Sequence, residues 1–278
     1  MQFGVSTHLF HNSPLAQAHL QMVADRGFEA LELFATRTHF DYHDATRVAA
    51  LRDWLRQTGL TLNSVHAPIT DSLVNGVWGT SYSNAATDSV RRQQAVQEAR
   101  HTLRLADDVP YRYLVVHVGV PAEYASGPAD NHRDAARRSV EELAEAAAQH
   151  GVQIALEVIP NDLSKPESLV RLIEDLELPQ VGICMDVGHA LLMGDVADAI
   201  ETVAGHLVTT HLHDNDGRKD DHRVPFEGRL DWPNALMAFQ KVGYDGVMLL
   251  ELANSSDPQD VLARARGART RFEEILAS

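Results

Sequence analysis

The chain has 278 residues, of which 44% are hydrophobic, so it can bury a large core, and its length suits a single α/β barrel domain. Its net charge of −15 disfavours unassisted binding to nucleic acid, because a phosphate backbone is usually bound by a basic surface. The chain has no run of about 18 apolar residues, no visible secretory signal and one cysteine, Cys184, so we expect a cytoplasmic protein without a membrane partner.

Short β-rich runs alternate with helical patterns along the whole chain. We expect strands at residues 3–6, 30–34, 61–66, 113–117, 152–157, 181–185, 207–212 and 247–251. We expect helices at residues 13–26, 45–57, 88–106, 135–149, 166–176, 195–204, 231–243 and 257–276. The first of these helices is predicted to begin at Ser13-Pro14, with Ser13 as its N-cap.

Eight strands, each followed by a helix, predict the fold class. The strand runs are apolar on both faces, which is typical of parallel strands covered by helices. Eight such units close most simply into a single (β/α)8 TIM barrel, here one domain spanning residues 1–278. A doubly wound open sheet is the alternative, but no GxGxxG follows the first strand, and we expect no nucleotide cofactor.

The long segment 69–84 interrupts this alternation after the third strand. A connection of this length favours a functional loop or lid. Its aromatic residues Trp78 and Tyr82, together with Phe10, are candidates for apolar walls against a substrate, and core packing is the alternative role for them.

Polar residues end the strands at the rim where TIM barrels carry their active sites. Each could have a structural role by itself: Glu157 could pair with an arginine, and Asp186 could cap a helix. The joint pattern over the third to eighth strands favours a divalent metal site instead. The residues concerned are His66, His117, Glu157, Asp186, His189, His211, His213 and Glu251.

The segment 208–231 adds further carboxylates and imidazoles directly after the seventh strand. Such a cluster suits a hard or borderline divalent cation, and a polar loop with capping histidines is the alternative. Its members are His211, His213, Asp214, Asp216, Asp220, Asp221 and His222.

Six motifs carry a resemblance to a known family. They are Ser64-Val65-His66-Ala67-Pro68, Val116-His117-Val118-Gly119, Leu156-Glu157, Met185-Asp186-Val187-Gly188-His189, His211-Leu212-His213-Asp214 and Leu250-Glu251. Over essentially its whole length, the chain resembles the xylose isomerase-like TIM barrel superfamily, which holds sugar isomerases and epimerases, inosose dehydratases and endonuclease IV. The resemblance implies the barrel, but the same frame hosts several reactions.

The resemblance to the isomerases and epimerases implies one divalent ion (Mn, Zn, Co or Mg) with four ligands. By position these ligands are Glu157, Asp186, His211 and Glu251. The resemblance to endonuclease IV implies a three-zinc cluster with additional ligands, which by position are His66, His117, His189, Asp220 and His222. His189 resembles a residue that contacts substrate oxygen, and His213 is assigned to a supporting or substrate-facing role.

We therefore predict a metal-dependent isomerase or epimerase of sugars or sugar phosphates that transfers a proton through a metal-stabilised enediolate. Glu157 and Glu251 are the predicted acid and base. His189, Trp78 and Arg223 are predicted to bind substrate. Arg223, Arg229 or Lys219 could bind a phosphate or carboxylate of the substrate, and solvated loop charge is the alternative role for these three residues.

Two other reactions use the same residues. A multi-zinc phosphodiesterase acting on abasic DNA is the first alternative, although the rim loops lack a basic stripe. An inosose-type dehydratase, which begins with the same proton abstraction, is the second. The expected partner is a small carbohydrate rather than nucleic acid, and homo-oligomers are frequent in the family.

One loop departs from the family pattern. The family carries Pro-Gly-x-Gly after the Asp-x-His motif, and this chain has Pro225-Phe226-Glu227-Gly228. Phe226 replaces the first glycine, so the sequence predicts a changed backbone path in this loop.

Overall fold

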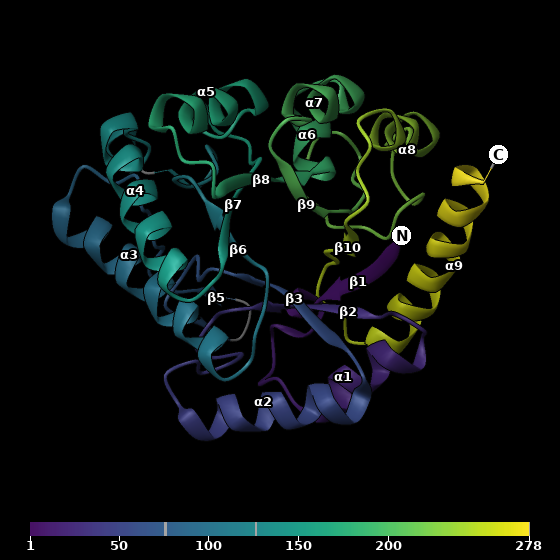
Figure 1. Ribbon diagram of the computed structural model, residues 1–278. Helices are drawn as coiled ribbons and strands as arrows, with labels where there is room; N and C mark the ends of the chain where they lie inside the picture. Colours follow the sequence, from purple (N-terminus) through teal and green to yellow (C-terminus); the bar gives the residue numbers. More distant parts are fainter. Residues whose placement is uncertain (75–76, 126, 278) are drawn as a thin grey trace.

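A barrel of eight parallel strands lies at the centre of the computed structural model, which describes residues 1–74, 77–125 and 127–277 (Figure 1). The strands pair in the order β10-β1-β2-β3-β6-β7-β8-β9, and a parallel bridge between Leu212 and Leu250 closes the ring. Their bounds are β1 Gln2–Ser6, β2 Ala30–Phe34, β3 Thr61–His66, β6 Tyr113–His117, β7 Gln153–Glu157, β8 Val181–Asp186, β9 Leu207–His211 and β10 Val247–Leu250. The predicted single (β/α)8 barrel is confirmed.

Helices surround the barrel on its outside (Figure 1). They are α1 Gln17–Asp25, α2 Ala45–Thr58, α3 Ser89–Leu103, α4 Arg133–Gln149, α5 Pro166–Leu176, α6 Val187–Met193, α7 Val196–Val203, α8 Trp232–Lys241 and α9 Pro258–Leu276. The last helix returns to the first strand, where the ring of Phe272 stacks on that of Phe3 with centroids 6.2 Å apart. Apolar contact therefore joins the two ends of the described chain.

Aspartates at the helix starts explain why the loops end where they do. An Asp side chain at the N-cap position accepts a hydrogen bond from a backbone N–H of the first turn and satisfies a group that has no partner within the helix. Six helices begin in this way, after Asp44, Asp88, Asp186, Asp195, Asp231 and Asp257.

The first helix begins later than the sequence predicts. Helix α1 begins at Gln17, and the chain before it forms a 3-10 helix, η1 (Thr7–Phe10), capped by Ser6. The Ser13 hydroxyl donates to the carbonyl of Phe10 rather than capping α1. The backbone N–H of Leu15 donates to the carbonyl of His39, so this stretch is held by the loop after β2.

The loop after β9 keeps an unusual backbone at Phe226, the residue that replaces the family glycine. Phe226 has φ of 73°, in the left-handed region that favours glycine. Its N–H donates to the buried carboxylate of Asp214, which also accepts from Leu230 N–H and the Trp232 indole. The Phe226 ring packs 5.3 Å from that of Phe272. These contacts stabilise a conformation that a phenylalanine alone would avoid.

The long segment 69–84 contains a small antiparallel hairpin, β4 (Leu73–Val74) and β5 (Val77–Trp78), whose residues 75–76 lie outside the described range. The hairpin stands beyond the C-terminal end of β3, on the rim that carries the predicted site residues. Within the described ranges, the structure contains no helix that is long and apolar enough to cross a membrane.

Gly267 offers a direct test of the α9 assignment. It lies exposed inside this helix, and a Cβ added there would meet no atom within 4 Å. Because glycine destabilises a helix interior relative to alanine, Gly267→Ala should raise the free energy of unfolding by about 1 kcal/mol. Urea denaturation followed by circular dichroism measures the change, and a less stable variant would contradict the α9 assignment.

Candidate active site

Four buried side chains from four adjacent strand ends meet at the C-terminal rim of the barrel. Glu157, Asp186, His211 and Glu251 come from the ends of β7 to β10, and each offers a ligand atom within 4.8 Å of the others. These are the four residues predicted as ligands of a single divalent ion. The parallel register explains the convergence, because Glu157 pairs with Cys184 in β8 and Asp186 with His211 in β9.

The two carboxylate oxygens of Glu157 face different histidines. Its Oε2 lies 3.1 Å from Nε2 of His66 and 3.1 Å from Nε2 of His117. Its Oε1 lies 3.3 Å from Nδ1 of His211. Glu157 thus belongs to two groups of candidate ligands, one formed with His66 and His117 and one with Asp186, His211 and Glu251.

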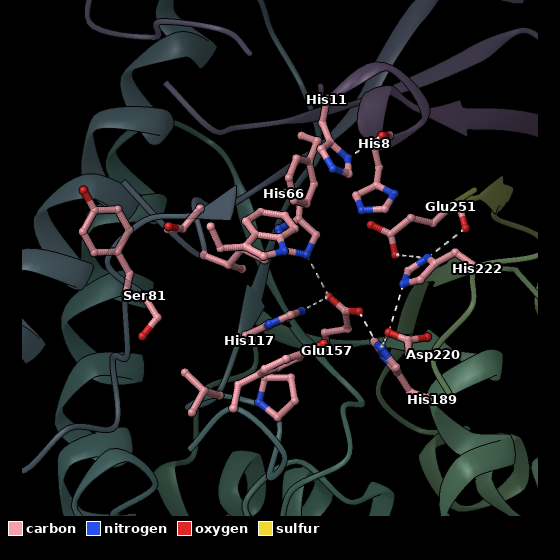
Figure 2. A pocket seen from close by; sticks show the side chains of 18 of the residues that line it. His8, His11, His66, Ser81, His117, Glu157, His189, Asp220, His222 and Glu251 are labelled. Carbon is pink, nitrogen blue, oxygen red and sulfur yellow. Dashed lines mark hydrogen bonds and ion pairs between the residues drawn. The ribbon is translucent and has the colours of Figure 1, made fainter. Parts of the chain in front are cut away.

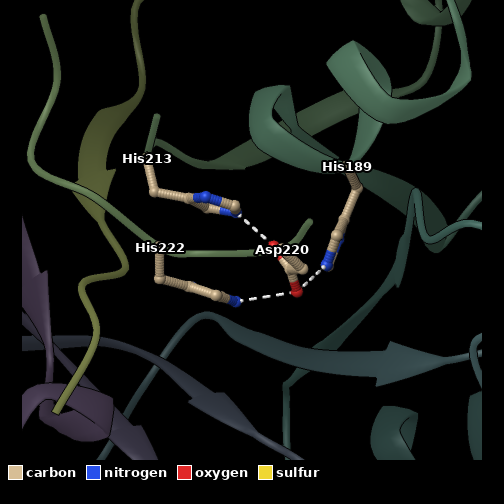
Figure 3. Close-up of side chains that lie close together, drawn as sticks. All are labelled: His189, His213, Asp220 and His222. Atoms are coloured by element: carbon tan, nitrogen blue, oxygen red, sulfur yellow. Dashed lines mark hydrogen bonds and ion pairs between the residues drawn. The ribbon is translucent and has the colours of Figure 1, made fainter. Parts of the chain in front are cut away.

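A third group lies beside these two, around the loop after β9. It consists of His189, His213, Asp220 and His222 (Figure 3). Oδ2 of Asp220 lies 3.0 Å from Nε2 of both His189 and His222. Nδ1 of His213 and Oδ1 of Asp220 are buried without a hydrogen-bond partner among the described residues.

The ring orientation of the histidines shows that positive charge is needed between them and the carboxylates. Nδ1 of His66 faces the carbonyl oxygen of Ala67 at 2.8 Å, so this nitrogen carries the proton. In a neutral ring, Nε2 then turns its lone pair toward the carboxylate of Glu157. Nε2 of His66 and Oε2 of Glu157 are only 3.1 Å apart, so their lone pairs repel each other unless a proton or a metal ion lies between the two atoms.

The same arrangement recurs at two histidines of the third group. Nδ1 of His189 faces the carbonyl of Val158, and Nδ1 of His222 faces that of Glu251, at 3.1 Å each. Their Nε2 atoms both point at Asp220 (Figure 3). The donor set of imidazole nitrogens and carboxylate oxygens therefore fits divalent cations such as zinc or manganese.

The electrostatics agree with this geometry. Burial by itself would raise the pKa of Glu157, but His117 and His211 outweigh it and hold that pKa well below its usual range. Burial likewise works to lower the pKa of His222, yet Asp220 raises it to about 9. Buried carboxylates thus attract cations strongly, and without a metal ion the protons on these histidines supply the charge.

Glu32 supports the group from the opposite side, and the sequence analysis missed it. It is fully buried in β2, where its Oε2 lies 3.0 Å from Nε2 of His211 and accepts a hydrogen bond from the Ser64 hydroxyl. This contact orients the His211 ring and leaves Nδ1 to face the other carboxylates. The available signal was a charged residue inside the apolar strand run Ala-Leu-Glu-Leu-Phe.

Gly188 creates the space for His213. A Cβ at position 188 would collide with the His213 ring, so the glycine lets β9 and α6 approach closely. Nε2 of His213 lies 3.1 Å from the Asp186 carboxylate. This contact places His213 beside a candidate ligand, and its supporting role stays a prediction.

A cavity of about 510 Å³ opens above these groups (Figure 2). Its described lining includes Trp78 and Tyr82 from the 69–84 segment, which were predicted as apolar walls. Phe10 does not contribute and stacks on the ring of His19 instead. No described lysine or arginine lines the cavity. Arg223, predicted to bind substrate, lies outside the lining and pairs with Asp221.

His8 and His11 line the same cavity and were also missed by the sequence analysis (Figure 2). Both belong to the η1 region, which directly follows β1. The signal that identifies the other histidines, an imidazole just after a strand, applies to His8 as well, although the run of polar strand ends described above begins at the third strand. The rings of His8 and His222 are stacked with centroids 4.9 Å apart.

Comparisons with known proteins agree with this fold. The family described as xylose isomerase-like TIM barrel matches residues 20–272. An uncharacterized protein of Methanocaldococcus jannaschii, MJ1311, is 28% identical over 92% of this chain and 85% of its own length. D-psicose 3-epimerase of Agrobacterium fabrum is 25% identical over 84% of this chain and 78% of its own. The crystal structure of a D-tagatose 3-epimerase-like protein superposes with a TM-score of 0.82 at 25% identity, covering 100% of this chain and 98% of that one.

The Glu32–His211 contact predicts a measurable effect on metal affinity. Replacing Glu32 with Gln weakens the partner that orients His211, and loss of such a partner typically costs about 10- to 100-fold in metal affinity. Zinc or manganese titration of metal-stripped protein by calorimetry measures this change. Glu141→Gln, at an exposed position of α4, is the matched control. Equal affinities for the Glu32 variant and wild type would show that the contact does not tune the site.

Proposed function

Because the chain belongs to the xylose isomerase-like TIM barrel family, we propose that it is a divalent-metal-dependent isomerase or epimerase of carbohydrates. The convergence of Glu157, Asp186, His211 and Glu251 carries this proposal. The epimerase names of two of the similar proteins support it.

These four side chains are the proposed holders of one divalent ion. Three buried carboxylates around a single imidazole would be costly to desolvate without a compensating cation. A bound ion would act as a Lewis acid for the negative charge that develops on the substrate oxygens.

Glu157 and Glu251 are the proposed proton carriers. Isomerisation and epimerisation both remove a proton from the carbon next to a carbonyl, which gives an enediolate. One carboxylate takes this proton, and a carboxylic acid on the other side returns a proton to the substrate.

Two further residues are proposed to position the substrate. His189 lines the cavity beside Asp220 and can bind a substrate hydroxyl, and the exposed indole of Trp78 offers an apolar face on the other side of the cavity. Arg223 receives no such role in the proposal, because Asp221 holds its guanidinium outside the cavity.

The two glutamates are the direct test of the mechanism. Glu157→Gln and Glu251→Gln should each lower kcat by at least about 10²-fold, because an amide cannot take up a proton. Ketoses, sugar phosphates and inososes are incubated with each variant, and the products are separated by liquid chromatography. Inososes are included because a dehydratase begins with the same proton abstraction.

Glu141→Gln should keep wild-type rates in this assay. Metal content is measured for every variant, so that a lost proton carrier is distinguished from a lost metal ion. Wild-type kinetics in both active-site variants would refute the acid and base assignment.

A second candidate function is metal-dependent phosphodiester hydrolysis. It is favoured by the two additional ligand groups, one around His66 and His117 and one around Asp220, which lie next to the first. Several metal ions could activate water and stabilise the leaving oxygen of a phosphodiester. The lack of any described lysine or arginine in the cavity lining, together with the net charge of −15, opposes a nucleic-acid substrate.

Metal stoichiometry separates the two candidates. Protein purified without added metal or chelator is analysed by elemental mass spectrometry, and we expect about one ion per chain. Asp220→Asn should then leave this content unchanged, since Asp220 lies outside the four-ligand group. Two or three zinc ions per chain, reduced by Asp220→Asn, would favour the hydrolase, and an abasic DNA duplex would become the first substrate to test.

A further inference from the structure

One wall of the cavity is formed by two histidines that belong to none of the three ligand groups. His8 and His11 lie together, with ring centroids 4.3 Å apart, on the side of the cavity opposite Glu157 (Figure 2). The ring of His11 also contacts that of Trp78 at 5.4 Å, and both imidazoles pack against Phe34. This packing fixes both rings in place.

Hydrogen bonds to the backbone fix the proton on each ring. Nδ1 of His8 lies 2.8 Å from the carbonyl oxygen of Leu252, and Nδ1 of His11 lies 2.6 Å from the carbonyl oxygen of His8. A carbonyl only accepts, so Nδ1 donates in both rings, and Nε2 of a neutral ring is left as an acceptor. Among the described residues, neither Nε2 has a hydrogen-bond partner.

His39 shows what distinguishes this pair. Its Nδ1 also faces a carbonyl, that of Ser13 at 2.6 Å, and its Nε2 also lacks a partner. His39 is nevertheless sealed inside the protein and does not line the cavity. His8 and His11 border open space, where a ligand can reach them.

The charges around the cavity limit which ligands can approach. The described lining contains the carboxylates Glu157, Asp220, Asp221 and Glu251, and it contains no lysine or arginine. An acceptor nitrogen cannot bind the oxygens of a phosphate dianion, which have no proton to donate. It can bind a hydroxyl, which donates readily.

We propose that His8 and His11 recognise two substrate hydroxyl groups and select an uncharged polyhydroxy substrate, an unphosphorylated sugar or cyclitol, over its phosphorylated counterpart. This inference rests on the proposed function and deepens it by naming the substrate class. The pair acts on binding and positioning, and the proton transfer belongs to the glutamates.

The first experiment compares matched ligands on metal-loaded wild-type protein. D-Fructose, D-psicose, D-tagatose and myo-inositol are the uncharged probes, and the 6-phosphates of the three ketoses are their charged counterparts. Binding is measured by calorimetry. At least one uncharged probe should bind. Any ketose that binds should do so at least tenfold more tightly than its own 6-phosphate.

The second experiment removes the acceptors and keeps the rings. His8→Phe and His11→Phe should each weaken binding of the preferred probe about tenfold, as expected for the loss of a hydrogen bond. His8→Gln returns an acceptor oxygen and should recover most of the affinity. His39→Phe, outside the cavity, is the matched control and should bind as wild type does. Metal content and the melting temperature identify any variant that is misfolded.

The outcomes separate this inference from the proposed function. Tighter binding of the phosphates, no binding of any uncharged probe, or unchanged affinity in both phenylalanine variants would overturn the role of His8 and His11. Turnover is measured separately. If the protein binds the probes through these histidines but converts none of them, the proposed isomerase activity is contradicted and the role of His8 and His11 in recognition stands. Turnover with unaltered KM in both variants contradicts the pair and leaves the isomerase intact.

Discussion

The concentration of negative charge at the barrel rim is the constraint on which the rest of the site depends. Each histidine there donates a hydrogen bond from one ring N–H to a fixed acceptor. The acceptor is a backbone carbonyl for His66, His189 and His222 and the Glu32 carboxylate for His211. Their other ring nitrogen faces a carboxylate about 3 Å away and would repel it without a cation between them. The backbone and Glu32 thus fix the ring orientation that a bound metal ion requires.

The barrel fold brings these charged residues together. Eight parallel strands bring their C-terminal ends to one rim, so residues separated by almost 100 positions, such as Glu157 and Glu251, meet there. The strands below them are mostly buried and mostly apolar. In the loop after β9, a hydrogen bond to the Asp214 carboxylate stabilises the left-handed backbone conformation of Phe226.

The cavity above the rim divides into two chemically different parts. One part carries the candidate metal ligands and the carboxylates proposed for proton transfer. The other consists of His8, His11 and aromatic side chains, and offers neutral acceptors and apolar surface to a ligand. Substrate recognition is thus proposed to occur on a wall whose residues come from the η1 region after β1 and from the 69–84 segment, and chemistry on residues from the later strands.

The sequence by itself determined the barrel and the rim residues of the later strands. Alternating apolar runs and capped helices predict eight βα units. Parallel strands end at a common rim, so the sequence alone places His66, Glu157 and Asp186 together. The start of α1 was misplaced, because Ser13 and Pro14 have local helix-start chemistry but the chain there is held by His39.

Only the tertiary structure decided which nitrogen of each ring faces the site and which distant residues support it. Glu32 is a single charge in an apolar strand, and its contact with His211 depends on the folding of β2 against the barrel interior. Arg223 appeared suited to bind an anion, but the path of its loop pairs it with Asp221. Ring orientation and charge pairing are set by contacts between residues far apart in the chain, and the order of amino acids does not specify such contacts locally.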